Sequence, residues 1–351
     1  ERPGHFERDF EKDGAGILGK GTFGQVFRVK KRGSDRLFAV KRSKPYEGGR
    51  HRARLLEEVD VLRHLTLANG NTQSTPSTHR TTQGHDNVLH FIDAWEQDCT
   101  LYIQTELCEL GSLETYLAGY GKLHDRLDEG RLWKILSEVG NGLLHIHRCG
   151  VLHLDLKPAN IFVTDEGRLR IGDFGMATRW PRPEAQSNDG GGFEREGDRE
   201  YLAAEILVGV YGPAADIFSF GMIMLEAAGN IVVPSYGEMW HALRNDDFSA
   251  VCLDGYSFVL VNTIRSMMAS DYTTRPSIET LSAMDPVLHA RAAMRRTRLD
   301  RVGTGKMFKA SAFAAEGPGF LTEILGAEVV ATIRPFPAGC VPSDADMDLG
   351  E

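Results

Sequence analysis

Hydrophobic and polar positions alternate along the first third of the chain. Residues 25–33, 36–42, 87–97 and 100–107 alternate apolar with polar side chains, which is typical of half-buried strands. Residues 53–65 instead repeat apolar positions at helical spacing. This region is therefore predicted to form a sheet accompanied by one helix.

Helical spacing dominates from Ser112 onward, over residues 112–120, 131–150 and 216–229. The change from strands to helices near Cys108 marks a boundary, and 351 residues exceed one ordinary core. We therefore expect an α+β fold of two packed lobes. The predicted divisions are a strand-rich lobe over 1–107, a helical lobe over 108–290, and a C-terminal tail over 291–351.

Two segments lack a clear periodic pattern. Residues 69–86 are rich in Ser, Thr and Asn, and they are expected to form a disordered insertion. Beyond about Asp285 the pattern weakens, and the tail is expected to be partly disordered. Its apolar stretch GFLTEILG, residues 319–326, is either an amphipathic docking helix or part of that disorder.

Composition excludes several classes of protein. A net charge of -9 argues against nucleic acid as an obligatory partner. The five cysteines are scattered without a CxxC spacing, so neither a disulfide framework nor a zinc site is predicted, and a reducing compartment follows. The most apolar stretch, which begins at Ile217, is too short to span a bilayer, and no signal segment opens the chain. The first residue is not Met, which suggests a fragment.

A glycine motif, G-x-G-x-x-G over residues 19–24, lies between Leu18 and Val26. Its glycines allow backbone N–H groups to approach phosphate closely. The same motif opens Rossmann folds, but there it precedes a helix, whereas here it precedes a strand. We therefore expect a nucleotide to lie beneath a β-hairpin.

Charged residues at three further positions suit the same chemistry. Lys41 ends the strand FAVK, where a lysine holds the α- and β-phosphates and pairs with a helical glutamate. Glu58 is the favoured partner, with Glu57 as the alternative. Asp173, in IGDFG, supplies a carboxylate that can bridge magnesium to phosphates.

The segment HLDLKPAN, residues 153–160, completes the set in the expected order. From about Phe6 to Leu288 the chain resembles the eukaryotic protein kinases, whose catalytic loop is H-R-D-L-x-x-x-N. This resemblance implies the bilobal protein kinase fold, ATP and Mg²⁺. It also implies a buried ion pair of Glu205 with Arg275.

The resemblance assigns the site residues by role. The catalytic residues are Asp155 as the base, Lys157, Lys41 and Glu58, and the metal ligands are Asn160 and Asp173. In the nucleotide site, adenine is expected between Val26 and Ala39 above and Phe162 below, against the backbone of Glu106 and Cys108, with Thr105 limiting depth. The full nucleotide set is Leu18, Gly19, Lys20, Gly21, Thr22, Phe23, Gly24, Val26, Ala39, Lys41, Thr105, Glu106, Cys108 and Phe162.

Several longer stretches resemble the Wee/Myt mitotic-inhibitor kinases, especially the fungal Wee members. They are AVKRSK, QTELC, HLDLKPANIF, EGDREYLAAE, ADIFSFG and AAGNIVVPSYGEMWHALR. This resemblance implies phosphorylation of a cyclin-dependent kinase, bound to cyclin, on a tyrosine of its glycine-rich loop. Such phosphorylation inhibits that kinase and delays mitosis. A nuclear location is implied, with the cytoplasm in addition.

Two alternatives remain. Lys157 is the form of the loop found in serine/threonine kinases, so a generic kinase of that class is one. A non-catalytic binding module with the same fold is the other. The Myt branch carries a membrane segment, whereas residues 319–333 are interrupted by Glu323 and Glu328 and are too short to cross.

Leu154 occupies the place of the usual arginine. That arginine pairs with a phosphate on the activation segment, and leucine cannot. We therefore expect an enzyme that needs no activating phosphate, with the charges of EREGDRE, residues 194–200, holding the segment instead. The alternative is that Leu154 merely packs.

Overall fold

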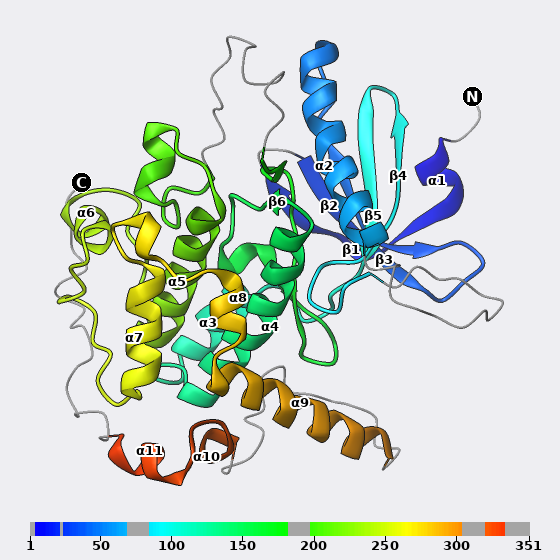
Figure 1. Ribbon diagram of the computed structural model, residues 1–351. Coiled ribbons are helices and arrows are strands. Elements are labelled where there is room, and N and C mark those ends of the chain that lie inside the picture. Colours follow the sequence, from blue (N-terminus) through cyan, green and yellow to red (C-terminus); the bar gives the residue numbers. More distant parts are fainter. Residues whose placement is uncertain (1–3, 22–23, 69–83, 182–196, 304–319, 334–351) are drawn as a thin grey trace.

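The computed structural model describes residues 4–21, 24–68, 84–181, 197–303 and 320–333, with the backbone alone at residue 15 and over 297–303. The chain forms a smaller part built around a sheet and a larger helical part (Figure 1). This arrangement matches the α+β fold predicted from the sequence. The last strand of the sheet ends at Glu106 and the next helix begins at Leu113.

The smaller part contains one antiparallel sheet of five strands in the order β1-β2-β3-β5-β4. The strands are β1 (Phe10–Gly21), β2 (Gly24–Lys31), β3 (Leu37–Ser43), β4 (Phe91–Gln97) and β5 (Thr100–Glu106). Helix α2 (Gly48–Ala68) packs against β4 and β5 and also contacts the larger part, and the short α1 (His5–Asp9) precedes the sheet (Figure 1). The alternating segments are thus confirmed as strands, whereas α1 was not predicted.

The two faces of this sheet carry different chemistry because side chains alternate along each strand. One face packs an aromatic cluster of Phe6, Phe10, Phe27, Val29, Phe38, Val40 and Tyr102. On the other face the register places Val26 opposite Lys41, and Ala39 opposite Thr105. Four predicted site residues therefore share one surface.

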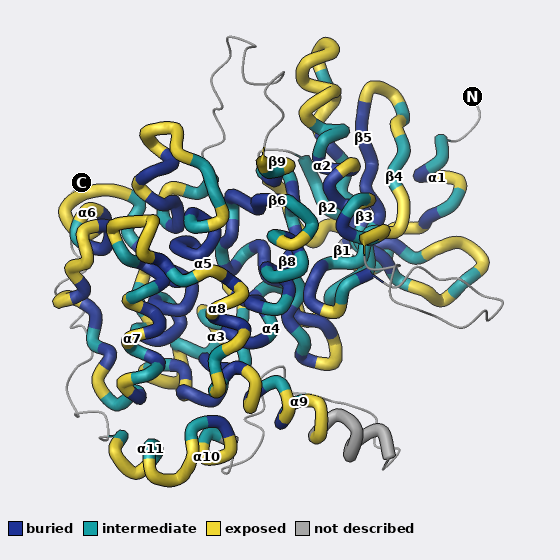
Figure 2. Tube along the Cα trace, viewed as in Figure 1, coloured by how far each residue is buried: buried dark blue, intermediate teal, exposed yellow. Residues whose placement is uncertain are grey.

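Helices form most of the larger part. They are α3 (Leu113–Gly121), α4 (Glu129–Arg148), α5 (Pro213–Gly229), α6 (Glu238–Arg244), α7 (Phe258–Met267), α8 (Ile278–Ser282), α9 (Asp285–Gly303), α10 (Phe320–Leu325) and α11 (Ala327–Thr332). Side chains of Ser112, Asp128 and Ser257 cap the starts of α3, α4 and α7. Helices α4 and α5 are largely buried (Figure 2), so they form a rigid support.

Short strands of the larger part carry the loops that matter most. Strand β6 (Val151–Leu152) pairs with β9 (Thr178–Arg179), and β7 (Ile161–Val163) pairs with β8 (Leu169–Ile171). The segment 153–160 therefore joins two short strands above α4 and α5.

The C-terminal tail includes helices that pack on the larger part. Helix α9 continues through Gly303, and α10 packs on α9 and α4. Ala290, Ala293 and Ile324 are buried in the main core. Helix α9 was not predicted, and its small alanines let it lie close to α4. The expected partial disorder of residues 291–351 stays a prediction. The apolar stretch forms a docking helix.

The predicted insertion lies mostly outside the described residues, which omit 69–83. Its last three residues, 84–86, are described, and the ring of His85 stacks on His145 at 4.5 Å. The expected disorder of residues 69–86 stays a prediction. None of the helices in the described ranges is long and apolar enough to cross a membrane.

Candidate active site

The glycine motif forms the tip of the β1–β2 hairpin, where Gly21 pairs with Gly24. Gly24 has a φ of 151°, and a Cβ there would lie 2.0 Å from the carbonyl oxygen of Arg42, so only glycine fits. Leu18, Gly19 and Lys20 are exposed beside it. Thr22 and Phe23 lie outside the described residues. The motif runs into a strand, as predicted, and not into a Rossmann helix.

In the β5–α3 connection some backbone groups are already hydrogen-bonded, and others remain available to a ligand. The N–H of Glu106 donates to the carbonyl of His90 at 3.1 Å, so Glu106 has only its carbonyl oxygen to offer. Thr105 donates its hydroxyl to that oxygen at 3.1 Å. Cys108 is half-buried two residues on, and Phe162 is half-buried in β7. These positions suit the predicted adenine site.

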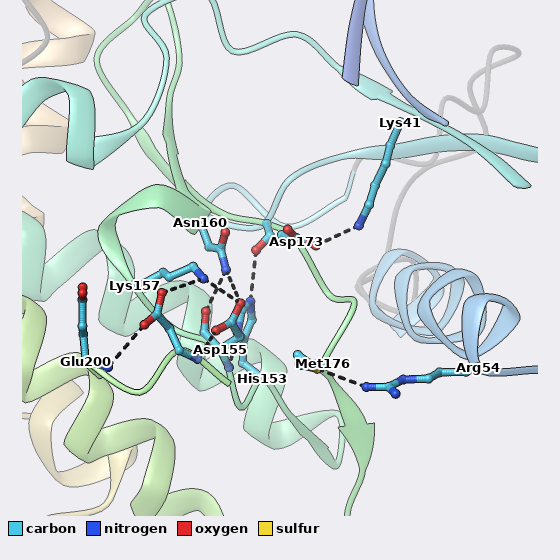
Figure 3. Close-up of polar contacts among 11 residues, drawn as sticks. Lys41, Arg54, His153, Asp155, Lys157, Asn160, Asp173, Met176 and Glu200 are labelled. Carbon is cyan, nitrogen blue, oxygen red and sulfur yellow. Dashed lines mark hydrogen bonds and ion pairs between the residues drawn. The ribbon is translucent and has the colours of Figure 1, made fainter. Parts of the chain in front are cut away.

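Lys41 forms the centre of a partly buried charge cluster, and Figure 3 shows its contact with Asp173. Its Nζ lies 2.7 Å from Oε1 of Glu58 and 2.9 Å from Oδ1 of Asp173. Burial would lower the pKa of Lys41, but the two carboxylates outweigh it and raise that pKa. The same ammonium lowers the pKa of Asp173. The predicted pairing with Glu58 forms, while Glu57 accepts a bond from Thr178 at 3.3 Å.

Asp155 is oriented by three neighbours. Nδ2 of Asn160 donates to its carbonyl oxygen at 2.8 Å and to its Oδ2 at 3.0 Å. Nζ of Lys157 lies 3.3 Å from the same Oδ2. The backbone N–H of Asp198 donates to Oδ1 at 2.8 Å. Asn160 and Lys157 thus hold Oδ2, as Figure 3 shows, and the Asp198 N–H holds Oδ1.

The loop that carries Asp155 is anchored from below by Asp216 of α5. Its fully buried carboxylate accepts from the backbone N–H of His153 at 2.9 Å and of Leu154 at 2.8 Å. His147 contacts the same carboxylate at 2.9 Å. Leu154 has a φ of 61° and only 6% exposure. Its side chain therefore packs in the core.

Asp198 is the functional residue that the motif reasoning did not assign to the site. Its carboxylate lies 3.2 Å from Nζ of Lys157, in addition to the backbone bond to Asp155. Gly197 makes this approach possible, since a Cβ there would lie 2.2 Å from the carbonyl oxygen of Leu154. The acidic part of EGDREYLA was the available signal. Glu194 to Glu196 lie outside the described residues.

The segment after Asp198 is held by α6. Nε of Arg244 donates to the carbonyl of Leu202 at 2.9 Å, and its Nη2 donates to those of Arg199 and Glu200 at 3.1 Å. Trp240 donates to the Arg199 carbonyl at 2.9 Å. Burial lowers the pKa of Arg244 to about 10. Four bonds to main-chain carbonyls thus fix the shape of this segment.

The predicted ion pair of Glu205 with Arg275 is present and buried. Nη2 of Arg275 lies 3.0 Å from Oε2 of Glu205, and the arginine side chain is 1% exposed. The pair therefore fixes Glu205, which ends the activation segment (residues 173–205), to Arg275.

Both predicted metal ligands have suitable chemistry. Asp173 offers a carboxylate, and among the described residues the amide oxygen of Asn160 accepts no hydrogen bond. No cluster of three His, Cys, Asp or Glu side chains suited to a metal occurs in the described part of the chain. One or two oxygen ligands fit a Mg²⁺ ion that is held mainly by phosphates and water.

Comparison with known proteins agrees with this geometry. Residues 13–285 match the model of the protein kinase domain. The chain belongs to the protein kinase family. Kinases of this family use ATP and a divalent metal ion.

The most informative relatives are Wee-type kinases. Mitosis inhibitor protein kinase wee1 of Schizosaccharomyces pombe is 46% identical over 236 residues, which cover 66% of this chain and 24% of that protein. Mitosis inhibitor protein kinase SWE1 of Candida albicans is 40% identical over 247 residues, covering 70% and 20%. The predicted resemblance to the fungal Wee members is confirmed.

A membrane-associated relative is somewhat more distant. The membrane-associated tyrosine- and threonine-specific cdc2-inhibitory kinase of Drosophila melanogaster is 37% identical over 279 residues, covering 79% of this chain and 47% of that protein. The chain thus spans between about a fifth and a half of the length of these three relatives.

Proposed function

We propose that this chain is a Mg²⁺- and ATP-dependent kinase that phosphorylates a cyclin-dependent kinase, bound to cyclin, on a tyrosine of its glycine-rich loop. The phosphorylation inhibits that partner and delays mitosis. The observation that carries the proposal is the acceptor-side cluster, in which Asp155, Lys157 and Asp198 meet. The names of the relatives, which are mitosis inhibitors and cdc2-inhibitory kinases, support the substrate class.

The residues divide the work of phosphoryl transfer. Asp155 accepts the proton of the acceptor hydroxyl, and its hydrogen bonds aim the carboxylate in advance. Lys41, held by Glu58, contacts the phosphates. Asp173 and Asn160 would hold Mg²⁺, which when bound neutralises charge on the phosphate oxygens. Catalysis then rests on positioning and electrostatics.

The position of Asp198 favours tyrosine, and not serine or threonine, as the acceptor residue. Lys157 is the serine/threonine-type lysine, but here its ammonium contacts two carboxylates, those of Asp155 and Asp198. Part of its charge is therefore already balanced before a substrate arrives. A tyrosine hydroxyl also reaches several ångströms further from its backbone, so the partner's main chain must be held farther out. Docking of a folded partner supplies that distance.

The test uses an intact complex of catalytically dead cyclin-dependent kinase with cyclin, incubated with the chain and Mg·ATP. We expect phosphate on the glycine-loop tyrosine by mass spectrometry, and much slower transfer to an isolated loop peptide. The Asp155→Asn variant serves as the inactive control. Phosphate found only on serine or threonine would instead support the generic kinase, and none at all would support a binding module. A nuclear location stays a prediction, to be checked by imaging of the tagged protein.

A further inference from the structure

Helix α2 must be held in place for the nucleotide site to be complete. Glu58 lies on this helix, and its 2.7 Å contact with Lys41 is lost if the helix shifts outward. In protein kinases this pair depends on the position of the helix, which phosphorylation of the activation segment often controls. Leu154 offers no partner to such a phosphate. Another device must therefore hold α2.

Contacts at the N-terminal end of α2 are too exposed to suffice. Arg52 pairs with Glu96 of β4, but the two side chains are 47% and 30% exposed. Exposed pairs of this kind contribute little. Arg54 contacts the sulfur of Met176 at 3.6 Å (Figure 3). Further along the helix, Glu57 accepts a hydrogen bond from Thr178 at 3.3 Å. The contacts of Arg52 and Arg54 lie at the exposed end of the helix and contribute little to holding it.

The C-terminal end of α2 is joined to the end of α4 by two reciprocal hydrogen bonds. Nε2 of His64, in α2, lies 2.8 Å from the carbonyl oxygen of Cys149, which ends α4. Nε2 of His145, in α4, lies 3.0 Å from the carbonyl oxygen of Leu65, in the last turn of α2. Each imidazole therefore donates to a carbonyl at the C-terminal end of the other helix, where the carbonyl groups need partners from outside the helix. The two helices cap one another.

The surroundings of this junction strengthen it. The ring of His145 stacks on His85 at 4.5 Å with an interplanar angle of 7°. Leu62 and Leu65 of α2 are 4% and 2% exposed and belong to the same core as α4. A hydrogen bond shielded in this way costs more to break, because the carbonyl would be left buried without a donor.

We propose that His64 and His145 are positioning residues: they form a reciprocal helix-capping clamp that keeps α2, and with it Glu58, in place without a phosphate on the activation segment. The inference rests on the proposed kinase function for its meaning, but the clamp is a property of the fold. It predicts that nucleotide affinity depends on two histidines remote from the nucleotide.

The first test measures binding of a non-hydrolysable ATP analogue and hydrogen exchange of residues 48–68. We expect the double variant His64→Leu, His145→Phe to bind the analogue about tenfold more weakly and to exchange faster in α2. His64→Gln and His145→Gln keep an amide donor and should stay within about twofold of the wild type. His289→Phe is the matched control, since Nδ1 of His289 makes a similar bond to the carbonyl of Ile324, 3.0 Å long, away from α2.

The second test asks whether the clamp acts through Glu58. In a Glu58→Gln background, the histidine substitutions should weaken analogue binding no further. If the double variant does not fold, His145→Phe alone serves, because it keeps the ring that stacks on His85. Unchanged affinity and unchanged α2 exchange in a folded variant would overturn the clamp, as would equal losses in the Gln variants or additive losses with Glu58→Gln. Neither readout requires phosphotransfer, so a failure of the proposed function would be recognised separately.

Discussion

The nucleotide side and the acceptor side of the site are built in different ways. The nucleotide-side cluster of Lys41, Glu58 and Asp173 draws on β3, α2 and the loop after β8, and the Glu58 side chain is 7% exposed. The acceptor-side cluster of Asp155, Lys157 and Asp198 comes from the β6–β7 loop and from the segment around Asp198. The two clusters are about equally exposed, since their side chains are 7–38% exposed on the nucleotide side and 13–35% exposed on the acceptor side. They differ in which elements supply the charges.

The difference predicts which substitutions affect the nucleotide and which affect the protein substrate. A nucleotide is the same for every kinase, so its cluster can be built from common motifs. The protein substrate differs, and here the acceptor side depends on Asp198 and on the segment that Arg244 holds. The two clusters should therefore fail in separable ways when they are mutated.

The largest effect is expected at the base. Asp155→Asn should lower kcat by about 10³-fold, because general-base catalysis typically contributes 10²–10⁴-fold. Affinity for the ATP analogue should stay within a few-fold, since Asp155 does not grip the nucleotide. Single-turnover phosphotransfer and calorimetric binding measure the two quantities. Near-normal turnover would show that Asp155 is not the general base.

On the nucleotide side, Asp173→Asn should mainly weaken nucleotide binding, whereas Asp155→Asn mainly lowers turnover. Loss of a charged ligand is worth about 1.5–3 kcal/mol, so the Kd for Mg·ATP should rise about 10- to 100-fold. The dependence on Mg²⁺ concentration should also shift upward. Asp165→Asn, in the exposed β7–β8 turn, is the control. An unshifted Mg²⁺ dependence would contradict the assignment.

Asp198→Asn sharpens the comparison further. It keeps the backbone bond to Asp155 but removes the charge facing Lys157, so kcat toward the folded substrate should fall about tenfold. Analogue affinity should not change. Asp254→Asn, at an exposed position, should leave both quantities as they are. A loss of nucleotide affinity in Asp198→Asn would show that the two sides are not separable.

A smaller effect concerns stability beside the acceptor side. Burial raises the pKa of Glu226 to about 7, even though the Tyr201 hydroxyl donates to it at 2.7 Å. A raised carboxyl pKa favours the folded state at low pH, and this contribution is lost as the pH rises from about 4.5 through 7. Glu226→Gln should therefore stabilise the protein by about 1–2 kcal/mol at pH 8 and hardly at all at pH 4.5. Chemical denaturation at the two pH values measures the difference.

No effect is expected from phosphatase treatment. Leu154 cannot pair with phosphate, and Thr178 and Tyr201 are 2% and 8% exposed. Ser187, the third hydroxyl residue between Gly175 and Glu205, lies outside the described residues. Activity assays before and after treatment provide the measurement. If treatment silenced the enzyme while Asp198 proved dispensable, the interpretation of Leu154 would be wrong.

Sequence patterns predicted the contacts of Lys41 with Glu58 and Asp173, because each motif fixes one residue and the kinase order fixes the rest. The nucleotide contacts of the other assigned residues stay predictions. The pairing of Lys41 with Glu58 and of Glu205 with Arg275 followed directly. The acceptor side was harder, because Asp198 meets Lys157 across 41 residues, and no periodic pattern encodes such a contact. Helix α9 was missed since its arginines obscure the alanines that pack on α4.

The alternation of the β3 side chains has one last consequence. Phe38 and Val40 point into the aromatic cluster, while Ala39 and Lys41 lie on the opposite face. A slip of one residue against β2 and β5 would therefore exchange the ammonium for a valine and bury the charge among aromatic rings. The length of the turn over residues 32–36 therefore sets the register of β3 against β2, and with it the position of Lys41. Insertions there should be tolerated only when the pairing of Val26 with Lys41 is preserved.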